Sequence, residues 1–374
     1  MKTDFTDYTK LDQKLFQMAG TVETNLLKFI NPQNSAEQKS KFFELLAKGE
    51  NYDPSFSYVP RNPLYSYFTM NPVLDIYVRE LKEMIKEVSM DELGVIFESE
   101  ILDLLDRIEM IKGVGTANFS GNSESYYGVI DHGTLSVAKE LVGKKVEEKF
   151  TPISLDFAVS EINHFLEKKK LSHMVKIREP SGARFAVINS TKEVLVNNDT
   201  VFSKEMLARL IAHEVETHIY RYENGLRQPY KLLAQGFSRE TTETEEGLAV
   251  CIEKLRGVSS EKQVKEYAGR VIAIHTAQKH CFCETYQEMC KYFSEDDAFR
   301  LTLRAKRGTK DQEKPGSFFK DALYLRGMLR VEEFLKEHDY KELYYAKYAI
   351  FDIPLVMDIP GLKEPKYLPD FGKK

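Results

Sequence analysis

Residues 202–225 read FSKEMLARLIAHEVETHIYRYENG and predict one helix that carries two histidines. Ser203 suits the N-cap, because its hydroxyl can accept a hydrogen bond from a free amide of the first turn. Gly225 suits the position just after the end of the helix. Apolar residues recur at helical spacing through the stretch, so one face of this helix is expected to be buried. We therefore expect the fold to be organised around it.

The two histidines of this helix, His213 and His218, are five residues apart, with Glu214 after the first. In the familiar zinc-peptidase helix the spacing is four, which advances about 400° and keeps both rings on one face. Five residues advance about 500° and would separate the rings by roughly 140°. A π-bulge widens the turn, and such bulges are frequent at functional sites. We therefore predict a π-bulge between His213 and His218; the alternative is an ordinary solvated helix face.

A carboxylate further along the chain could complete a metal site. Residues 238–257 read SRETTETEEGLAVCIEKLRG, in which Thr244 suits the N-cap of a second helix, with Glu245 and Glu246 in its first turn. Two histidines and one glutamate from a neighbouring helix form a common catalytic zinc site. Glutamates at the start of a helix also favour its dipole, which explains Glu245 equally well.

These stretches resemble the microtubule-associated tyrosine carboxypeptidase family and its bacterial relatives, which are known by a "QEGLA motif". The resemblance covers roughly residues 60–370, and it is weaker at 62–68 (NPLYSYF), 123–128 (SESYYG), 303–308 (LRAKRG) and 316–327 (GSFFKDALYLRG). This chain departs from the bacterial pattern at Glu245, where the motif implies Gln. The residues that match the central family pattern are His213, Glu214, His218, Arg221, Asn224, Arg227-Gln228-Pro229 and Glu246-Gly247-Leu248-Ala249.

The resemblance implies a zincin-like fold, one catalytic zinc ion, and release of a C-terminal tyrosine or similar aromatic residue from a peptide or protein tail. It assigns the zinc to His213, His218 and Glu246, and the general base to Glu214. Tyr324 is expected to stabilise the developing oxyanion. A carboxypeptidase also needs a cation for the substrate's terminal carboxylate. The candidates for that cation are Arg221, Arg227, Arg307, Lys320 and Arg326.

Other residues near the metal are expected to orient its ligands. Glu245 and Asn224 are expected to orient the ligands without touching the metal, and Arg221 could share that role instead of binding substrate. The segment 183–198 is a candidate edge strand for an extended peptide. For the cation candidates, the alternative is an ordinary surface charge or structural ion pair.

The fold class expected from the whole chain is α+β, mostly α, with a small β-sheet directly before the zinc-binding helix. Residues 183–199 predict two strands around a turn at 189–192, and 174–180 predicts a further short strand. Two helices broken at 31–34 and helices within 73–112 are expected, whereas 115–128 reads as a loop. We expect a helical N-terminal extension at 1–55 and the zincin-like domain at 56–374.

Net charge, hydropathy and cysteine content exclude several classes of function. The 374 residues carry a formal net charge of −5, so no overall basic field exists to attract nucleic acid or an anionic membrane. No stretch has the roughly 20 apolar residues that a membrane span requires. Four cysteines, three of them within 281–290, read as free thiols rather than a disulfide framework or a second metal site with His275 and His280. The expected location is the cytoplasm.

Two other functions are compatible with the same residues. One is a zinc aminopeptidase or endopeptidase on this scaffold, with Glu216 or Glu245 receiving a substrate ammonium group. The other is a non-catalytic regulatory protein that keeps a structural zinc. Glu214 argues against the second, because a structural site has no use for a carboxylate beside its first ligand.

Overall fold

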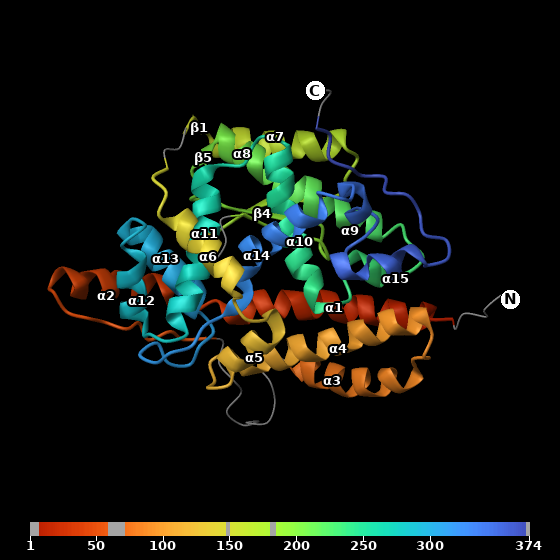
Figure 1. Ribbon diagram of the computed structural model, residues 1–374, viewed down its shortest axis with the longest axis horizontal. Helices are drawn as coiled ribbons and strands as arrows, with labels where there is room; N and C mark the ends of the chain where they lie inside the picture. Colours follow the sequence, from red (N-terminus) through yellow and green to blue (C-terminus); the bar gives the residue numbers. More distant parts are fainter. Residues whose placement is uncertain (1–6, 59–71, 147–149, 180–184, 372–374) are drawn as a thin grey trace. The chain divides into compact units, whose positions relative to one another are not determined.

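A computed structural model describes residues 7–58, 72–146, 150–179 and 185–371 of the chain. The fold is mostly helical, with small sheets that directly precede the histidine-bearing helix, so the predicted fold class is confirmed at this level. Contacts divide the chain into two units, and Figure 1 labels helices and strands of both. We call Gln17–Lys145 with Gln263–Arg326 the helical unit, and Asp7–Phe16, Val146–Lys262 and Gly327–Lys374 the sheet-containing unit. The boundary predicted between residues 55 and 56 stays a prediction.

The N-terminal helices agree with the sequence pattern. The turn expected at 31–34 separates the first two helices, and the helical segment at 73–112 forms two more. An aromatic cluster of Phe42, Phe282 and Phe299 packs in the core of the helical unit, with ring centroids 5.2–5.6 Å apart. The helices that lie wholly or partly in this unit are α1 (Thr9–Ile30), α2 (Ser35–Ala47), α3 (Pro72–Met84), α4 (Glu92–Gly113), α5 (Phe119–Tyr127), α6 (His132–Val142), α11 (Glu261–Ala277), α12 (Phe282–Met289), α13 (Glu295–Lys306) and α14 (Leu323–Phe334).

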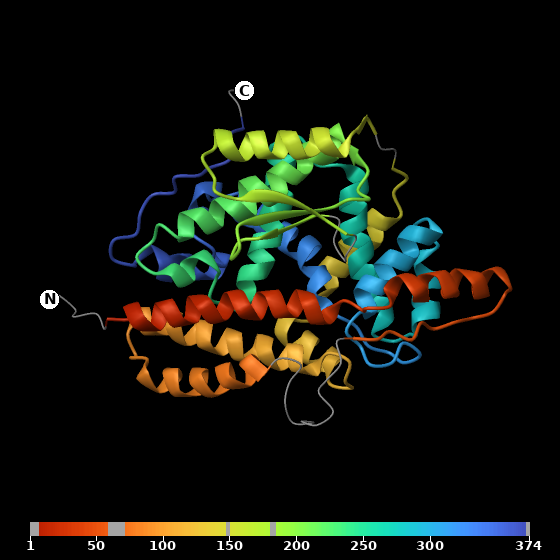
Figure 2. The ribbon, with the colours of Figure 1, turned by 180° about the vertical axis from the view of Figure 1, so that it is seen from behind.

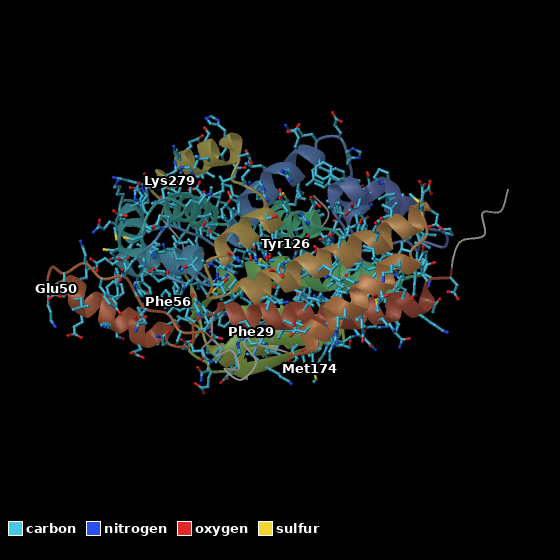
Figure 3. The ribbon with its side chains drawn as sticks, turned by 90° about the horizontal axis from the view of Figure 1, so that it is seen from below. Phe29, Glu50, Phe56, Tyr126, Met174 and Lys279 are labelled. Atoms are coloured by element: carbon cyan, nitrogen blue, oxygen red, sulfur yellow. The ribbon has the colours of Figure 1, made fainter. Side chains whose placement is uncertain are left out.

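The prediction of a loop over residues 115–128 was wrong, because helix α5 occupies Phe119–Tyr127. Its sequence is rich in Ser, Asn and Gly and has little helical periodicity. Tertiary contacts hold it instead: the Ser123 hydroxyl accepts a hydrogen bond from the Phe319 amide at 2.9 Å, and the Tyr126 hydroxyl donates to Asp103 on α4 at 2.6 Å. Figure 3 labels Tyr126. Polar residues that favour loops in isolation are thus fixed in a helix by buried partners.

The sheet-containing unit holds the predicted strands, which are β2 (Met174–Arg178), β3 (Phe185–Ile188) and β4 (Glu193–Asn197). They form a three-stranded sheet in the order β2-β4-β3, with β2 parallel and β3 antiparallel to β4. Two short strands, β1 (Pro152–Ile153) and β5 (Phe202–Ser203), pair separately. Helix α7 (Leu155–Lys168) packs beside β2, and β3 contacts the histidine-bearing helix (Figure 2).

The histidine-bearing helix begins at α8 (Lys204–Leu210), where the Ser203 hydroxyl accepts from the Met206 amide as predicted. It continues through a π-helical segment (Ile211–Ile219) into α9 (Tyr220–Gly225). The position predicted for Gly225 was wrong by one residue, because it is the last helical residue and not the one after the end. A Cβ at Gly225 would lie 2.5 Å from the Ala234 Cα, so close backbone approach, and not a left-handed turn, requires glycine here.

The predicted start of the second helix was also wrong. Helix α10 runs over Arg239–Leu255, and its cap is Ser238, whose backbone and side chain are both hydrogen-bonded to the Thr241 residue. Glu245 and Glu246 therefore lie in the middle of α10 and not in its first turn. The Thr244 hydroxyl, predicted as the cap, instead accepts from the Ile350 amide, close to the short helix α15 (Ile353–Met357).

Two glycines let α10 and α14 approach backbone to backbone. A Cβ at Gly247 would lie 2.2 Å from the carbonyl carbon of Gly327, and a Cβ at Gly327 would lie 2.2 Å from the Glu243 carbonyl oxygen. The neighbours in these contacts are backbone atoms, which cannot move aside by rotating a side chain. The glycine that follows the metal-ligand candidate Glu246 is thus required by packing.

Replacing Gly247 with Ala is expected to lower the free energy of unfolding by about 1–3 kcal/mol or more, because the added methyl group forces α10 and α14 apart. Gly121→Ala is a matched control, since Gly121 is also helical and a Cβ there meets nothing within 4 Å. The control should be neutral or stabilising by up to about 1 kcal/mol. Denaturant unfolding of both variants measures the difference. Equal stabilities would contradict the close packing.

Candidate metal centre

The π-helical segment brings the two histidines to one side of their helix. In a π-helix the backbone amide of each residue donates a hydrogen bond to the carbonyl five residues earlier. The Thr217 hydroxyl also donates to the Ala212 carbonyl, five residues earlier, at 3.1 Å. His213 and His218 consequently lie with ring centroids 5.1 Å apart. The predicted π-distortion is confirmed, and it extends over Ile211–Ile219 instead of a single turn.

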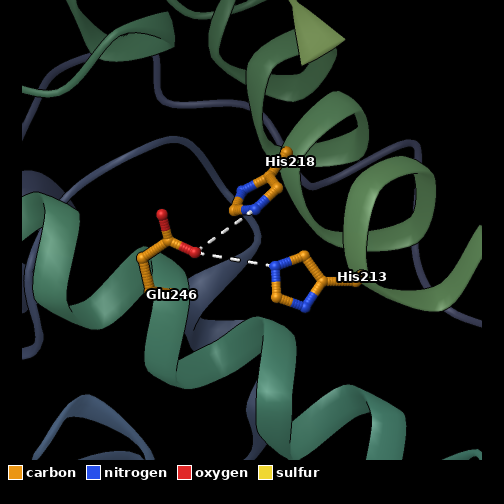
Figure 4. Close-up of side chains that lie close together, drawn as sticks. All are labelled: His213, His218 and Glu246. Carbon is orange, nitrogen blue, oxygen red and sulfur yellow. Dashed lines mark ion pairs between the residues drawn. The ribbon is translucent and has the colours of Figure 1, made fainter. Parts of the chain in front are cut away.

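Three donor atoms from two helices converge (Figure 4). The Glu246 Oε2 atom lies 3.6 Å from His213 Nε2 and 3.8 Å from His218 Nε2, and the ligand atoms of all three residues lie within 4.8 Å of one another. Tetrahedral zinc with ligands at about 2.0–2.1 Å places neighbouring donors roughly 3.4 Å apart. The group therefore has the spacing and the nitrogen and oxygen chemistry to hold one metal ion.

The Nδ1 atom of each histidine also lies within hydrogen-bonding distance of a carboxylate. Glu253 Oε1 lies 2.7 Å from His213 Nδ1, and Glu245 Oε1 lies 2.8 Å from His218 Nδ1. Because an ionised carboxylate only accepts hydrogen bonds, each Nδ1 carries a proton, which leaves each Nε2 as the nitrogen that could bind a metal ion beside Glu246. Burial disfavours protonation of His213. Hydrogen bonds with Glu246 and Glu253 outweigh this effect and, with no metal ion bound, raise the pKa of His213 to about 10.

Glu245 belongs to a buried network of charges. Burial opposes its ionisation, but Lys347 and Arg221, together with His218, outweigh this and hold the pKa of Glu245 far below its usual range. Lys347 Nζ lies 2.9 Å from Glu245 Oε1, and the Arg221 Nη1 donates to Oε2. Glu245 thus remains ionised, and its charge supports the proton on His218 Nδ1.

Arg221 is fully buried, and its donors face protein acceptors. Besides Glu245, its guanidinium donates to the carbonyls of Leu343 at 2.7 Å, Ala346 at 3.1 Å and Tyr348 at 2.8 Å. It holds the segment around 343–348 against the metal helix. These contacts favour the orienting role over contact with substrate.

Glu214 lies on the π-helical segment directly after His213, and it is close enough for its charge to favour protonation of that imidazole. Its side chain is partly exposed. In the described part of the chain, its carboxylate has no hydrogen-bond or ion-pair partner, whereas Glu216 two residues on is buried beside Arg256 at 3.1 Å. Glu214 is thus the acidic residue of this segment that is available to a water molecule.

Asn224 and Arg227 hold the C-terminal segment. Asn224 Nδ2 donates to the Tyr344 and Tyr367 carbonyls, both at 2.8 Å, and its Oδ1 accepts from the Tyr367 amide at 2.9 Å. Arg227 Nη1 lies 3.3 Å from the Glu364 carbonyl. Neither side chain has a recorded contact with the metal-ligand candidates, so Asn224 supports them only through the backbone it fixes.

The remaining substrate-binding candidates belong to the helical unit. Arg307 pairs with Asn31 and Asp321, and Arg326 donates to the carbonyls of Tyr127 and Val129. Tyr324 stacks on Tyr267 with ring centroids 5.2 Å apart. Lys320 is half-buried. Their roles toward a substrate stay predictions. The family-like segment 62–68 lies outside the described residues.

Sequence reasoning missed Glu253 and Lys347. Glu253 follows Glu246 by seven residues, or two helical turns, so its place on the same face of α10 was readable from the spacing. Lys347 lies a hundred residues from Glu245 in a segment without regular periodicity, and no local pattern indicates the contact.

Replacing Glu253 with Gln is expected to weaken zinc affinity about 10- to 100-fold, because the amide supports His213 less strongly than a carboxylate does. Competition with a chromophoric chelator measures the affinity. Glu216→Gln is the matched control, since it neutralises a buried carboxylate on the metal helix that contacts no histidine. Similar losses in both variants would show that the effect is general to buried charge.

The other histidines and the cysteines do not form a second centre within the described ranges, where His213, His218 and Glu246 are the one group with metal-site geometry. All four cysteines are free thiols, as expected. Among the described residues, every helix is also too short or too polar to cross a membrane.

Comparison with known proteins shows the family of the chain. The family model "Microtubule-associated tyrosine carboxypeptidase" matches residues 43–374. The mouse protein MATCAP2 is 26% identical over 203 residues, which are 52% of this chain and 38% of that protein. Human microtubule-associated tyrosine carboxypeptidase 1 is 32% identical over 152 residues, which are 39% of this chain and 31% of that protein. The matches span about a third of these relatives' length. Because the family model covers most of the sequence, the chain belongs to the microtubule-associated tyrosine carboxypeptidase family.

Proposed function

We propose that this protein is a zinc-dependent metallocarboxypeptidase of zincin-like architecture that removes a C-terminal residue, preferably tyrosine or another aromatic, from a peptide or protein tail. The observation that carries the proposal is the convergence of His213, His218 and Glu246 beside the available carboxylate of Glu214. Family membership supplies the reaction class. We also propose a cytoplasmic location, which the free cysteines and the family name support.

His213, His218 and Glu246 would hold the zinc ion, as their donor spacing and the carboxylates behind both imidazoles suit it. Bound zinc with three protein ligands supplies Lewis acidity, which acidifies a water molecule and polarises a carbonyl. Glu214 accepts the proton of the attacking water and then delivers it to the leaving amine. Tyr324 is proposed to donate a hydrogen bond to the developing oxyanion, and Arg227, Arg307, Lys320 and Arg326 stay candidates for binding substrate.

Strand β3 suits the backbone of an extended substrate. In the described residues it pairs only with β4, so its other edge has backbone groups available for strand addition. It also contacts the π-helical segment that carries the histidines. A peptide bound there would lie beside the helix that bears Glu214.

Peptides blocked at either end test the reaction class. Peptides ending in Tyr, Phe, Leu or Lys are incubated with zinc-loaded protein as free acids, as C-terminal amides and with acetylated N-termini, and products are identified by mass spectrometry. A carboxypeptidase releases the last residue from free acids, tolerates the acetyl group and fails on amides. Cleavage of amides would indicate an endopeptidase, and failure on acetylated peptides would indicate an aminopeptidase.

A further inference from the structure

Arg270 on α11 is a buried cation whose hydrogen bonds are incomplete. It is 8% exposed, and its Nη2 atom donates to Glu266 at 2.8 Å. Its Nε and Nη1 atoms are buried and have no hydrogen-bond partner in the described part of the protein. Buried charged donors are almost always satisfied in folded proteins, and an unsatisfied one calls for an explanation such as a bound ligand.

Two tyrosines lie beside this side chain. Tyr267 and Tyr324 stack with ring centroids 5.2 Å apart and an interplanar angle of 10°. The guanidinium carbon of Arg270 lies 5.0 Å from the Tyr267 centroid and 4.4 Å from that of Tyr324. These distances place the Arg270 guanidinium in cation–π contact with both rings. A ligand that satisfies Nε and Nη1 would have to lie in the plane of the guanidinium, because its N–H bonds lie in that plane.

Among the described residues, the ion pairs around Arg270 contain more arginines than carboxylates. Two clusters of ion pairs join four arginines to three carboxylates, which leaves one positive charge uncompensated within them; the residues are Arg270, Arg300, Arg304, Arg307, Glu266, Asp297 and Asp321. Asp321 lies close enough to Arg270 to join the two clusters electrostatically. Burial, together with the neighbouring Arg304 and Arg270, lowers the pKa of Arg307 to about 10 despite Asp321. The Arg307 Nε is a further buried donor without a partner in the described residues.

We propose that Arg270 binds a carboxylate, taken either from the end of a peptide or from a small organic acid. A carboxylate carries the single negative charge that the clusters lack, and its two oxygens match the planar donors of a guanidinium. This inference concerns equilibrium binding within the helical unit. It would hold for a protein without turnover, so it can fail or succeed independently of the proposed peptidase activity.

Calorimetric titration of the zinc-loaded 374-residue chain tests the proposal. The ligands are N-acetyltyrosine, its amide, propionate and inorganic phosphate. We expect N-acetyltyrosine to bind at least about 10-fold more tightly than its amide, as two charge-assisted hydrogen bonds are lost with the carboxylate. Tighter binding of N-acetyltyrosine than propionate would identify a peptide end, and equal binding a small acid. Equal affinity for acid and amide, or binding of phosphate alone, would overturn the proposal.

Variants separate binding at Arg270 from binding elsewhere, including at the metal. Arg270→Gln should weaken carboxylate binding at least about 10-fold and leave amide binding unchanged. Arg300→Gln is the matched control: it removes one positive charge that also pairs with Glu266, but its Nη atoms are already used by Glu266 and Asp297. The control should keep the preference for the acid over the amide.

Arg270→Lys covers the case in which Arg270→Gln does not fold. Lysine keeps the positive charge beside Glu266 but lacks the planar guanidinium that can make two hydrogen bonds to one carboxylate. We therefore expect carboxylate affinity to fall about 10-fold while the thermal unfolding transition stays normal. Undiminished carboxylate binding in the folded Arg270 variants would refute the assignment, as would an equal loss in Arg300→Gln.

Discussion

Glu214→Gln should lower kcat by about 10²- to 10⁴-fold on a peptide with a free C-terminal tyrosine, while zinc content stays at the level of the unaltered protein. The amide keeps the size and polarity of the side chain but cannot accept the proton of the attacking water, which is the usual contribution of a positioned general base. Because Glu214 has no hydrogen-bond or ion-pair partner in the described residues, its replacement removes no stabilising contact there. The loss should therefore fall on kcat, with KM little changed.

Glu216→Gln provides the control for this experiment. Glu216 lies two residues on in the same π-helical segment, is buried, and faces Arg256. Burial raises its pKa above the usual range, so neutralising it is expected to disturb the site little. Steady-state kinetics of both variants, with metal analysis of the same samples, separate loss of the base from loss of the metal. If Glu214→Gln retained full activity, Glu214 would not be the base, and the non-catalytic alternative would gain support.

Replacing a metal ligand should have a larger effect. His218→Ala or Glu246→Ala leaves two protein donors where three are needed, so zinc content is expected to fall from one ion per chain toward zero and peptidase activity to background. Loss of His218 also removes one of three partners of the Glu245 carboxylate, which keeps Arg221 and Lys347 and should preserve the local fold. Inductively coupled plasma mass spectrometry and thermal unfolding measure the two properties separately.

His275→Ala is the control for the ligand variants. His275 lies on α11 in the helical unit, where the described residues form no metal group around it. It should bind one zinc ion and keep full activity. Retention of zinc by His218→Ala together with its loss from His275→Ala would place the metal elsewhere and remove the basis of the proposed function.

The arrangement of the two histidines of the candidate site could be predicted from the sequence because it depends on residues close together in the chain. Two histidines five residues apart cannot share a ligand on a regular α-helix, so the combination implied a π-distortion, and the structure has one. The strands before the helix were also readable, because β-branched and apolar residues cluster around the turn at 189–192. In each case the determining contacts lie within a few residues of one another.

The errors and omissions arose where partners are distant in sequence. Thr244 resembles a cap because two glutamates follow it, yet Ser238 caps α10 and the Thr244 hydroxyl binds the backbone of Ile350. Helix α5 depends on Ser123 meeting the amide of Phe319. Arg270 has no signature in the sequence, because donors without partners are evident only when every neighbour is placed.

X-ray absorption spectroscopy at the zinc edge, on purified protein of measured metal content, tests the central claim most directly. We predict one zinc ion per chain with nitrogen and oxygen neighbours at about 2.0–2.1 Å, two of them imidazoles, and a signal that disappears in His218→Ala. A sulfur shell at about 2.3 Å, or a zinc signal unchanged by the loss of His218, would contradict the claim that the π-helical segment builds the metal site.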